Sequence, residues 1–179
     1  VVLKSVSPDS LHKPDAGGVK VDIKDEAGAR AAYKAILAAA KAYKADARIE
    51  GVAVQEMAPA GVEVILGSIN DPSFGPTVMF GLGGIFVEVL KDVTFRVAPV
   101  TAAQAGSMLD EIQAAPILKG ARGEKPRDRK ALASALAAYS AMVRDLEDEV
   151  GESDANPVLV YEDGRGLKIV DARILLKKR

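Results

Sequence analysis

Short apolar runs, each bounded by glycine, proline or polar residues, fill the middle of the chain and limit the folds that it can adopt. The runs are 52–57, 62–69, 77–80, 85–90 and 93–97. Runs of this length that are rich in Val and Ile and separated by turn residues are typical of β-strands. We therefore expect an antiparallel, strand-rich region in which the first two runs form a hairpin-like pair.

Two alanine-rich segments have the apolar spacing of helices, 25–45 and 128–150, and Asp25 is suited to cap the first. A shorter helix is expected at 101–112, with Thr101 as its N-cap, and a loop at 116–123. Further strands are expected at 1–4, 19–23, 158–161 and 167–170. The predicted fold class is α+β, with mostly antiparallel sheets flanked by helices, in one domain over 1–179 or in two small ones that share a core.

The composition excludes several classes of function. Lys and Arg number 24 against 25 Asp and Glu, so no overall basic field attracts nucleic acid or an anionic membrane. The absence of cysteine excludes disulfides, thiol catalysis and thiolate metal sites, and it fits a cytoplasmic protein. No apolar run is long enough to span a membrane, and no signal peptide is visible. Because the chain opens on Val1 inside a strand-like run, we expect a fragment of a longer protein.

The loop between the first two expected strands holds His12, the only histidine of the chain. It also contains two prolines and the pair Gly17-Gly18. Imidazole titrates near neutrality, so it can carry a proton or act as a nucleophile without large tuning of its pKa. From these residues alone, a solvent-exposed loop histidine without a chemical role is the more frequent case.

Three oxygen-bearing side chains near the end of the chain suggest a metal site. Asp154 and Asn156 lie two residues apart, and on an extended strand such residues point to the same face. A hairpin turning around Gly164 would bring Asn156 close to Asp171. Oxygen ligands from adjacent strands suit Mg²⁺, which commonly takes one or two protein oxygens together with substrate phosphates. The alternative is that Asp-x-Asn-Pro only opens a turn.

Other residues have the chemistry needed to hold a nucleotide. Lys4 ends a buried strand, the glycine-rich run 81–84 follows another, and Glu56 and Glu63 lie on neighbouring strands. Glycines let backbone N–H groups approach a phosphate, and carboxylates can bind ribose hydroxyls. Each feature has an ordinary alternative as well: a solvated strand end, a tight turn or bulge, and solvated edge charges.

Five segments in order, 1–19, 54–67, 71–88, 154–157 and 170–174, together resemble the ATP-grasp β portion of NDP-forming acyl-CoA synthetases, relatives of succinyl-CoA synthetase. They read Val-Val-Leu-Lys-x-x-Ser-Pro-Asp-x-x-His-Lys-x-Asp-x-Gly-Gly-Val, Val-Gln-Glu-Met-x-x-x-Gly-Val-Glu-x-Ile-Leu-Gly, Asp-Pro-x-Phe-Gly-Pro-x-Val-Met-Phe-Gly-Leu-Gly-Gly-Ile-x-Val-Glu, Asp-x-Asn-Pro and Val-Asp-Ala-Arg-Ile. The match covers nearly the whole chain, which makes it more specific than any single motif.

The resemblance implies an ATP-grasp fold, ATP or ADP with Mg²⁺ as bound groups, and the reaction acid + CoA + ATP ⇌ acyl-CoA + ADP + phosphate through acyl phosphate and phosphohistidine. It also implies a role for each candidate residue. Lys4 would contact the phosphates, Gln55, Glu56 and Met57 would form the adenine hinge, and Glu63 would face the ribose, while Gly83, Gly84 and Arg96 would line the cleft. Asn156 and Asp171 would hold Mg²⁺ with Asp154 beside them, and His12 would relay the phosphoryl group. The implied partner is a CoA-binding and ligase domain, or an α subunit, within an oligomeric parent enzyme.

The chain departs from this family pattern in several places. We expect the family's helical segment before Val1 and its CoA-binding and ligase domains to lie outside these residues, and Pro14 stands where Ser or Thr is usual. We therefore expect the fragment alone to bind nucleotide weakly and not to complete turnover. Two other functions stay open: a non-catalytic ATP-grasp sensor, as in fusions with a protein acetyltransferase, and a structural interaction domain.

Overall fold

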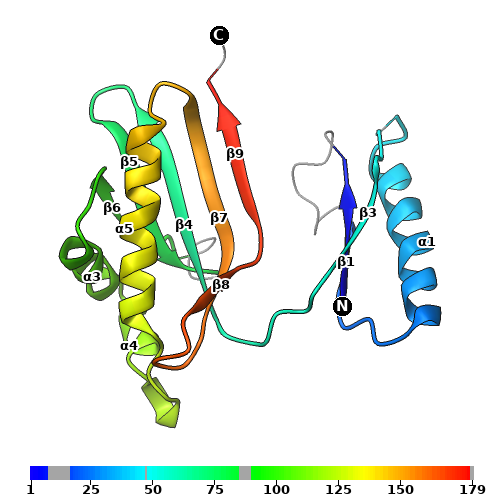
Figure 1. Ribbon diagram of the computed structural model, residues 1–179, viewed down its shortest axis with the longest axis horizontal. Coiled ribbons are helices and arrows are strands. Elements are labelled where there is room, and N and C mark those ends of the chain that lie inside the picture. The colour runs from blue at the N-terminus through cyan, green and yellow to red at the C-terminus, as the bar shows by residue number, and fades with distance from the viewer. Residues whose placement is uncertain (8–16, 47, 85–89, 178–179) are drawn as a thin grey trace. The chain divides into compact units, whose positions relative to one another are not determined.

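The computed structural model describes residues 1–7, 17–46, 48–84 and 90–177. These residues divide into two compact units, Val1–Pro59 and Ala60–Arg179. Each unit combines an antiparallel sheet with at least one helix, as the predicted fold class requires (Figure 1). None of the described helices is long and apolar enough to cross a membrane. The loop holding His12 and nearly all of the strand expected at 85–90 lie outside the described residues.

The first unit is a three-stranded sheet with one helix packed on it. Strand β1 (Val2–Val6) lies between β2 (Val19–Lys20) and β3 (Gly51–Gln55), and helix α1 (Glu26–Tyr43) follows β2 in the chain. The core between sheet and helix is formed by Leu3, Ala32 and Ile36.

The ends of the elements in this unit follow from local chemistry. The Asp25 carboxylate accepts a hydrogen bond from the Gly28 N–H at 2.7 Å, which confirms the predicted N-cap of α1. The strand expected at 19–23 is shorter, because Asp22 has a left-handed backbone with φ 57° and β2 ends at Lys20.

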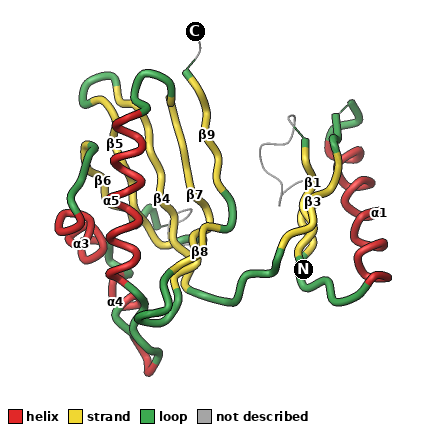
Figure 2. The backbone as a smooth tube through the Cα atoms, viewed as in Figure 1, coloured by secondary structure: helices red, strands yellow, loops and turns green. Residues whose placement is uncertain are grey.

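The second unit is a six-stranded antiparallel sheet with helices on one face. Its strands are β4 (Val62–Asp71), β5 (Gly75–Leu82), β6 (Val93–Val97), β7 (Val150–Val160), β8 (Leu167–Ile169) and β9 (Ala172–Leu176). Their order is β6-β5-β4-β7-β8, and β9 also pairs with β7. The helical segments are α3 (Ala102–Glu111), α4 (Ala115–Leu118), a 3₁₀ turn (Ala121–Gly123) and α5 (Arg129–Asp145), and Figure 2 shows α3 and α5 over one face of the sheet. The core includes Val64, Leu66, Val78, Phe80, Leu132, Leu136 and Val158.

Local details of the second unit both confirm and correct the sequence predictions. Thr101 caps α3 in a reciprocal capping box with Gln104, as predicted for this residue. The loop expected at 116–123 is instead partly helical, because it contains most of α4 and the 3₁₀ turn.

The hairpin-like pair expected between 52–57 and 62–69 is wrong. Strand β3 pairs with β1, whereas β4 pairs with β5 and β7, and β3 and β4 belong to different units. The connection between them contains Pro59, which has no N–H to donate to a ladder. It also passes so close to β7 that a Cβ on Gly61 would lie 2.9 Å from the Val160 carbonyl oxygen. The chain therefore leaves β3 without turning back on it.

The strand expected at 158–161 is longer than predicted, because β7 runs from Val150 to Val160. Its first half pairs with β4 on one edge and with β9 on the other, so the backbone groups of this segment are taken up by two ladders. These distant partners override the turn preference of Asp-x-Asn-Pro. Helix α5 ends correspondingly earlier than expected, at Asp145.

A buried carboxylate joins α5 to the sheet. Asp128 accepts from the N–H of Ala131, in the first turn of α5, and from the N–H of Gly166, in the β7–β8 turn, each at 2.9 Å. These two backbone donors hold the pKa of the Asp128 carboxyl below its usual value. Asp128 thus fixes the hairpin of β7 and β8 against the start of α5.

We expect Asp128→Ala to lower the free energy of unfolding by about 1–2 kcal/mol, because alanine accepts neither hydrogen bond. Chemical denaturation at neutral pH measures the change. Asp163→Ala, which removes an exposed carboxylate from the neighbouring turn, is the matched control and should change little.

The charge of Asp128 adds a pH dependence with a defined sign. Because its pKa is lowered in the folded state, its stabilisation is present above the pKa of the unfolded chain, about 3.9, and is lost as the pH falls through the folded pKa. The stability difference between the wild type and Asp128→Asn should therefore shrink on acidification. A difference that stays constant into the acid range would contradict this account.

Candidate functional site

Strands β7 and β9 bring two of the predicted metal ligands together. The chain leaves β7 through a turn containing Gly164, with φ 76°, and returns through β8 to β9. The Asn156 N–H then donates to the Asp171 carbonyl oxygen at 3.0 Å. Asn156 and Asp171 are thus neighbours across adjacent backbone segments, as the predicted hairpin requires.

A β-bulge in β7 lies at this point. One residue of β4, Ile65, faces both Asn156 and Pro157, because the pairing with β4 shifts register there. Before the bulge, Ser153 and Ala155 are buried, whereas their neighbours Asp154 and Asn156 are half-buried and exposed, respectively. Asp154 and Asn156 therefore belong to the face of β7 turned away from α5, in agreement with the predicted shared face.

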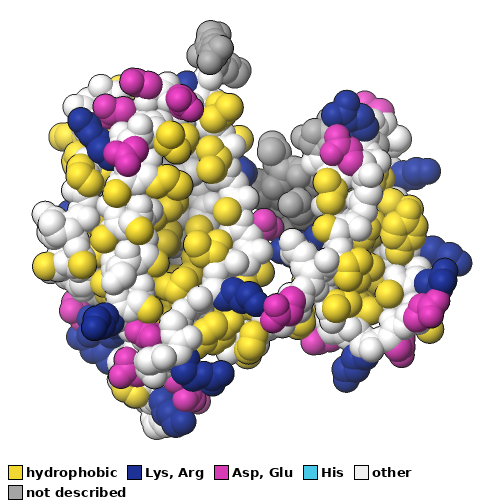
Figure 3. All heavy atoms as spheres, viewed as in Figure 1, with side chains coloured by type: hydrophobic (Ala, Val, Ile, Leu, Met, Phe, Trp, Pro, Cys, Tyr) yellow, Lys and Arg dark blue, Asp and Glu magenta, His cyan; other side chains and the backbone are white. Residues whose placement is uncertain are grey.

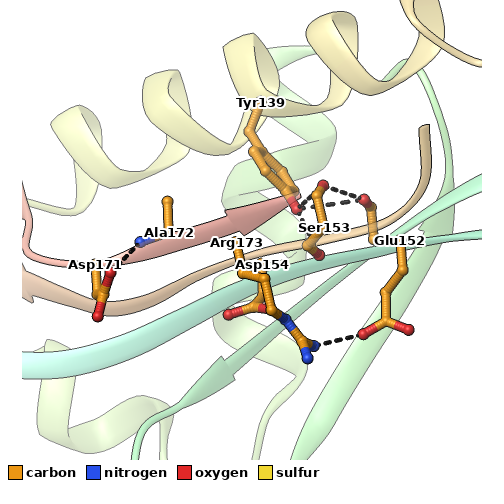
Figure 4. Close-up of polar contacts among 8 residues, drawn as sticks. Tyr139, Glu152, Ser153, Asp154, Asp171, Ala172 and Arg173 are labelled. Carbon is orange, nitrogen blue, oxygen red and sulfur yellow. Dashed lines mark hydrogen bonds and ion pairs between the residues drawn. The ribbon is translucent and has the colours of Figure 1, made fainter. Parts of the chain in front are cut away.

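The opposite face of β7 is fixed by a hydroxyl network. The Tyr139 hydroxyl on α5 donates to the Ser153 carbonyl oxygen at 2.9 Å and lies 2.7 Å from the Ser153 hydroxyl (Figure 4). The Ser153 hydroxyl is in turn 2.6 Å from the Ser68 hydroxyl on β4. Burial raises the pKa of the Tyr139 hydroxyl, so it remains a donor at neutral pH. The network holds the backbone next to Asp154.

The side chain of Asp154 itself is bound by an arginine that the sequence analysis missed. Arg173 on β9 is its register partner and donates from Nε to Asp154 Oδ2 at 2.9 Å. The same guanidinium donates from Nη2 to Glu152 Oε1 at 2.5 Å (Figure 4). The sequence analysis used only the aspartate of the segment Val-Asp-Ala-Arg. The pairing register of β7 with β9 would have revealed the contact, because it places Arg173 opposite Asp154.

Glu63 and the two predicted glycines also meet in the second unit. The Gly83 N–H donates to the Glu63 carbonyl oxygen at 2.8 Å, and a Cβ on Gly83 would lie 3.1 Å from the Glu63 Cβ. Gly84 follows with φ 63°, in the left-handed region that favours glycine. The backbone at the end of β5 therefore passes directly beside Glu63, which is exposed.

The remaining predicted residues lie in the first unit. Lys4 is 8% exposed and opposes Ala53, while Gln55 opposes Val2, so Lys4 and Gln55 occupy the same face of the sheet. This face is opposite to the one on which Leu3 packs against α1. Glu56 and Met57 follow the end of β3 and are exposed.

Arg96 has a structural partner. Its Nη2 donates to the carboxylate of Glu111 on α3, which also accepts from the Thr94 hydroxyl at 2.9 Å. The Thr94 hydroxyl and the Arg96 guanidinium hold the pKa of the Glu111 carboxyl below its usual value. Arg96 thus ties β6 to α3, and its expected place along a nucleotide cleft stays a prediction.

The chemistry of the Asn156 and Asp171 pair fits Mg²⁺. An amide oxygen and a carboxylate are hard oxygen donors, and two protein ligands leave positions for phosphate oxygens and water. Among the residues that the structure describes, no group of three or more His, Cys, Asp or Glu side chains could hold a metal ion. The described carboxylates thus form no all-carboxylate metal cage.

In Figure 3 the charged side chains of both signs are interspersed on each unit.

Comparison with known proteins identifies the class. The model of the ATP-grasp domain family matches residues 1–176, and the chain belongs to this family. It is 53% identical over 176 residues to the β subunit of acetate–CoA ligase (ADP-forming) I of Pyrococcus furiosus, covering 98% of this chain and 75% of that subunit. The chain therefore falls within the family of ADP-forming acyl-CoA ligases and spans about three quarters of this β subunit.

Two solved structures from Ca. Korarchaeum cryptofilum show the same fold. Acetyl-coenzyme A synthetase 1 in complex with coenzyme A, Ca-AMPCP and HgCl⁺ has a TM-score of 0.93 and 49% identity, covering 98% of this chain and 76% of that chain. The second structure is its Se-Met derivative with coenzyme A and Mg-AMPPCP, in which the phosphohistidine segment points towards the nucleotide-binding site. It has a TM-score of 0.82 and 45% identity, and the match covers 99% of this chain and 76% of that chain. The predicted ATP-grasp fold is confirmed.

The same substitution should have opposite effects at two glycines of the second unit. We expect Gly84→Ala to lower the free energy of unfolding by about 1 kcal/mol, because its φ of 63° is unfavourable for a residue with a Cβ. Gly106→Ala, inside α3, should instead raise it by about 0.5–1 kcal/mol, since a Cβ there meets none of the described atoms within 4 Å. Denaturant melts of both variants provide the test, and equal effects would contradict it.

Proposed function

We propose that this chain is the nucleotide- and Mg²⁺-binding part of an ADP-forming acyl-CoA synthetase. The observation that carries the proposal is the pair Asn156 and Asp171, joined by a backbone hydrogen bond in a family whose solved members hold nucleotide analogues with divalent cations. The parent enzyme would catalyse acid + CoA + ATP ⇌ acyl-CoA + ADP + phosphate.

In the second unit, Asn156 and Asp171 would bind Mg²⁺ through their side-chain oxygens, with Asp154 beside them. When bound, the ion would offset negative charge on the phosphates. Glu63 would accept hydrogen bonds from the ribose hydroxyls. The backbone at Gly83 and Gly84 would line the same site, since it lies against Glu63 and carries no side chain that would keep a ligand away.

In the first unit, Lys4 would donate to the phosphates, and its place next to β3 puts it on the same sheet face as Gln55. Gln55, Glu56 and Met57 would form the adenine hinge, with main-chain groups at the end of β3 available to the edge of the base. The exposure of Glu56 and Met57 supports this role, because a hinge must present its backbone to the ligand.

His12 would relay the phosphoryl group between the nucleotide and the ligase part of the enzyme. A ring nitrogen attacks the terminal phosphorus, the P–O bond to ADP breaks, and the phosphoryl group then leaves for the next acceptor. The acyl and CoA chemistry would take place on the partner, a CoA-binding and ligase domain or an α subunit, in an oligomeric parent.

Asp171→Asn should weaken the binding of nucleotide with Mg²⁺ by at least about tenfold in Kd, because it replaces the only carboxylate of the proposed pair. The backbone bond to Asn156 uses the Asp171 carbonyl and is unaffected by this change. Calorimetric titration of the full-length protein with ADP, with and without Mg²⁺, measures the effect.

The loss should be confined to the Mg²⁺-dependent part of nucleotide binding. Asp163→Asn, in the β7–β8 turn, serves as the control of equal charge change. If ADP and ATP with Mg²⁺ neither bind the wild type nor raise its melting temperature, the proposed function is wrong.

His12→Ala should abolish nucleotide-dependent phosphoryl transfer in the enzyme assembled with its partner, while nucleotide binding persists. Ser10→Ala, two residues before His12 in the sequence, is the control. The measurement is transfer of the terminal phosphoryl group from ATP to protein histidine and back to ADP. Unchanged transfer by His12→Ala would remove His12 from the mechanism, and absence of phosphohistidine in the wild type would favour a regulatory domain instead.

A further inference from the structure

Arg173 lies beside the proposed metal ligands but has no role in the function proposed above. Its guanidinium binds two carboxylates of β7 at once, Asp154 through Nε at 2.9 Å and Glu152 through Nη2 at 2.5 Å. In the pairing of β9 with β7, Arg173 opposes Asp154, and two residues further along β7 the Asn156 N–H meets Asp171. The ion pair and the proposed metal pair are therefore consecutive along one strand pair.

Asp154 precedes Asn156 by two residues on the same face of β7. Residues two apart on a strand are separated by about 6.5–7 Å and share a face. Asp154 cannot move to the other face, because its neighbour Ser153 is held there by Tyr139 and Ser68. The backbone thus fixes the position of Asp154, whereas the residue that binds its side chain determines the orientation of its carboxylate.

Arg173 is that partner. The Asp154 side chain is 23% exposed and the Arg173 side chain 35%, so their ion pair is partly shielded from water. An arginine that binds two carboxylates through different nitrogens also constrains their orientation more than a lysine would. Oδ2 of Asp154 is consequently engaged on β9, on the side of Arg173.

We propose that Arg173 is a specificity-determining residue for the metal, because it withholds the Asp154 carboxylate from the cation bound by Asn156 and Asp171. This inference rests on the proposed function. With Arg173 in place, the protein offers the metal one carboxylate and one amide oxygen, so retention of the metal depends on nucleotide phosphates. A second carboxylate would strengthen binding of the metal alone, more so for Ca²⁺, which takes more oxygen ligands than Mg²⁺.

The test is a calorimetric titration of the full-length protein with Mg²⁺ or Ca²⁺ in the absence of nucleotide. Arg173→Gln, which removes the charge but keeps a polar side chain, should bind either metal on the order of tenfold tighter than the wild type, with the larger gain for Ca²⁺. Adding Asp154→Asn to this variant should cancel the gain. Arg173→Lys keeps the charge and should lie closer to the wild type.

Arg144→Gln is the matched control, because Arg144 forms an ion pair with Glu147 at 2.7 Å elsewhere in the second unit. It should leave metal binding unchanged. The inference is overturned if Arg173→Gln binds metal no tighter than the wild type, or if the tighter binding persists when Asp154→Asn is added. If Arg173→Gln only lowers the stability of the protein, Arg173 serves solely to join β9 to β7 through its ion pairs. The proposed function is judged separately, by binding of nucleotide with Mg²⁺ to the wild type.

Discussion

The second unit depends on hydrogen bonding along both edges of β7. Strand β4 occupies one edge over nearly the whole length of β7, while β8 and β9 divide the other edge between them. A strand paired on both sides has its direction and register fixed, so its side chains alternate reliably between two faces. One face packs against α5, and the other carries Glu152 and Asp154. Core and candidate site are therefore built from the same strand.

The bulge at Asn156 and Pro157 makes this double use possible. Ala155 before the bulge and Val158 after it are both buried in the core, although three positions separate them and a regular strand would place them on opposite faces. The extra residue of the bulge resets the alternation of side chains between the two faces of the sheet. Both halves of β7 therefore direct their small or apolar residues toward α5. It also leaves Asn156 exposed beside Asp171, outside the alternation of the core.

What could be predicted from the sequence depends on how far apart the interacting residues lie. The caps at Asp25 and Thr101 are local, as is the hairpin that joins Asn156 to Asp171, and all were predicted correctly. The pairing of β3 with β1 and the uninterrupted course of β7 depend on distant strands, which outweighed the local turn preferences around Pro59 and in Asp-x-Asn-Pro. Arg173 was missed for the same reason, since its contact with Asp154 exists only in the register of two strands.

The charge of the site gives Arg173 a second consequence. Glu152, Asp154 and Asp171 place three carboxylates on one strand pair, where an anionic polyphosphate is proposed to bind. Two unit charges about 7 Å apart repel by about 2 kcal/mol at an effective dielectric constant of about 20, the value suited to sites near a protein surface. A guanidinium between Glu152 and Asp154 offsets much of this repulsion. If the proposed metal binds at Asp171, Arg173 would thereby let its charge dominate the field at the proposed phosphate site.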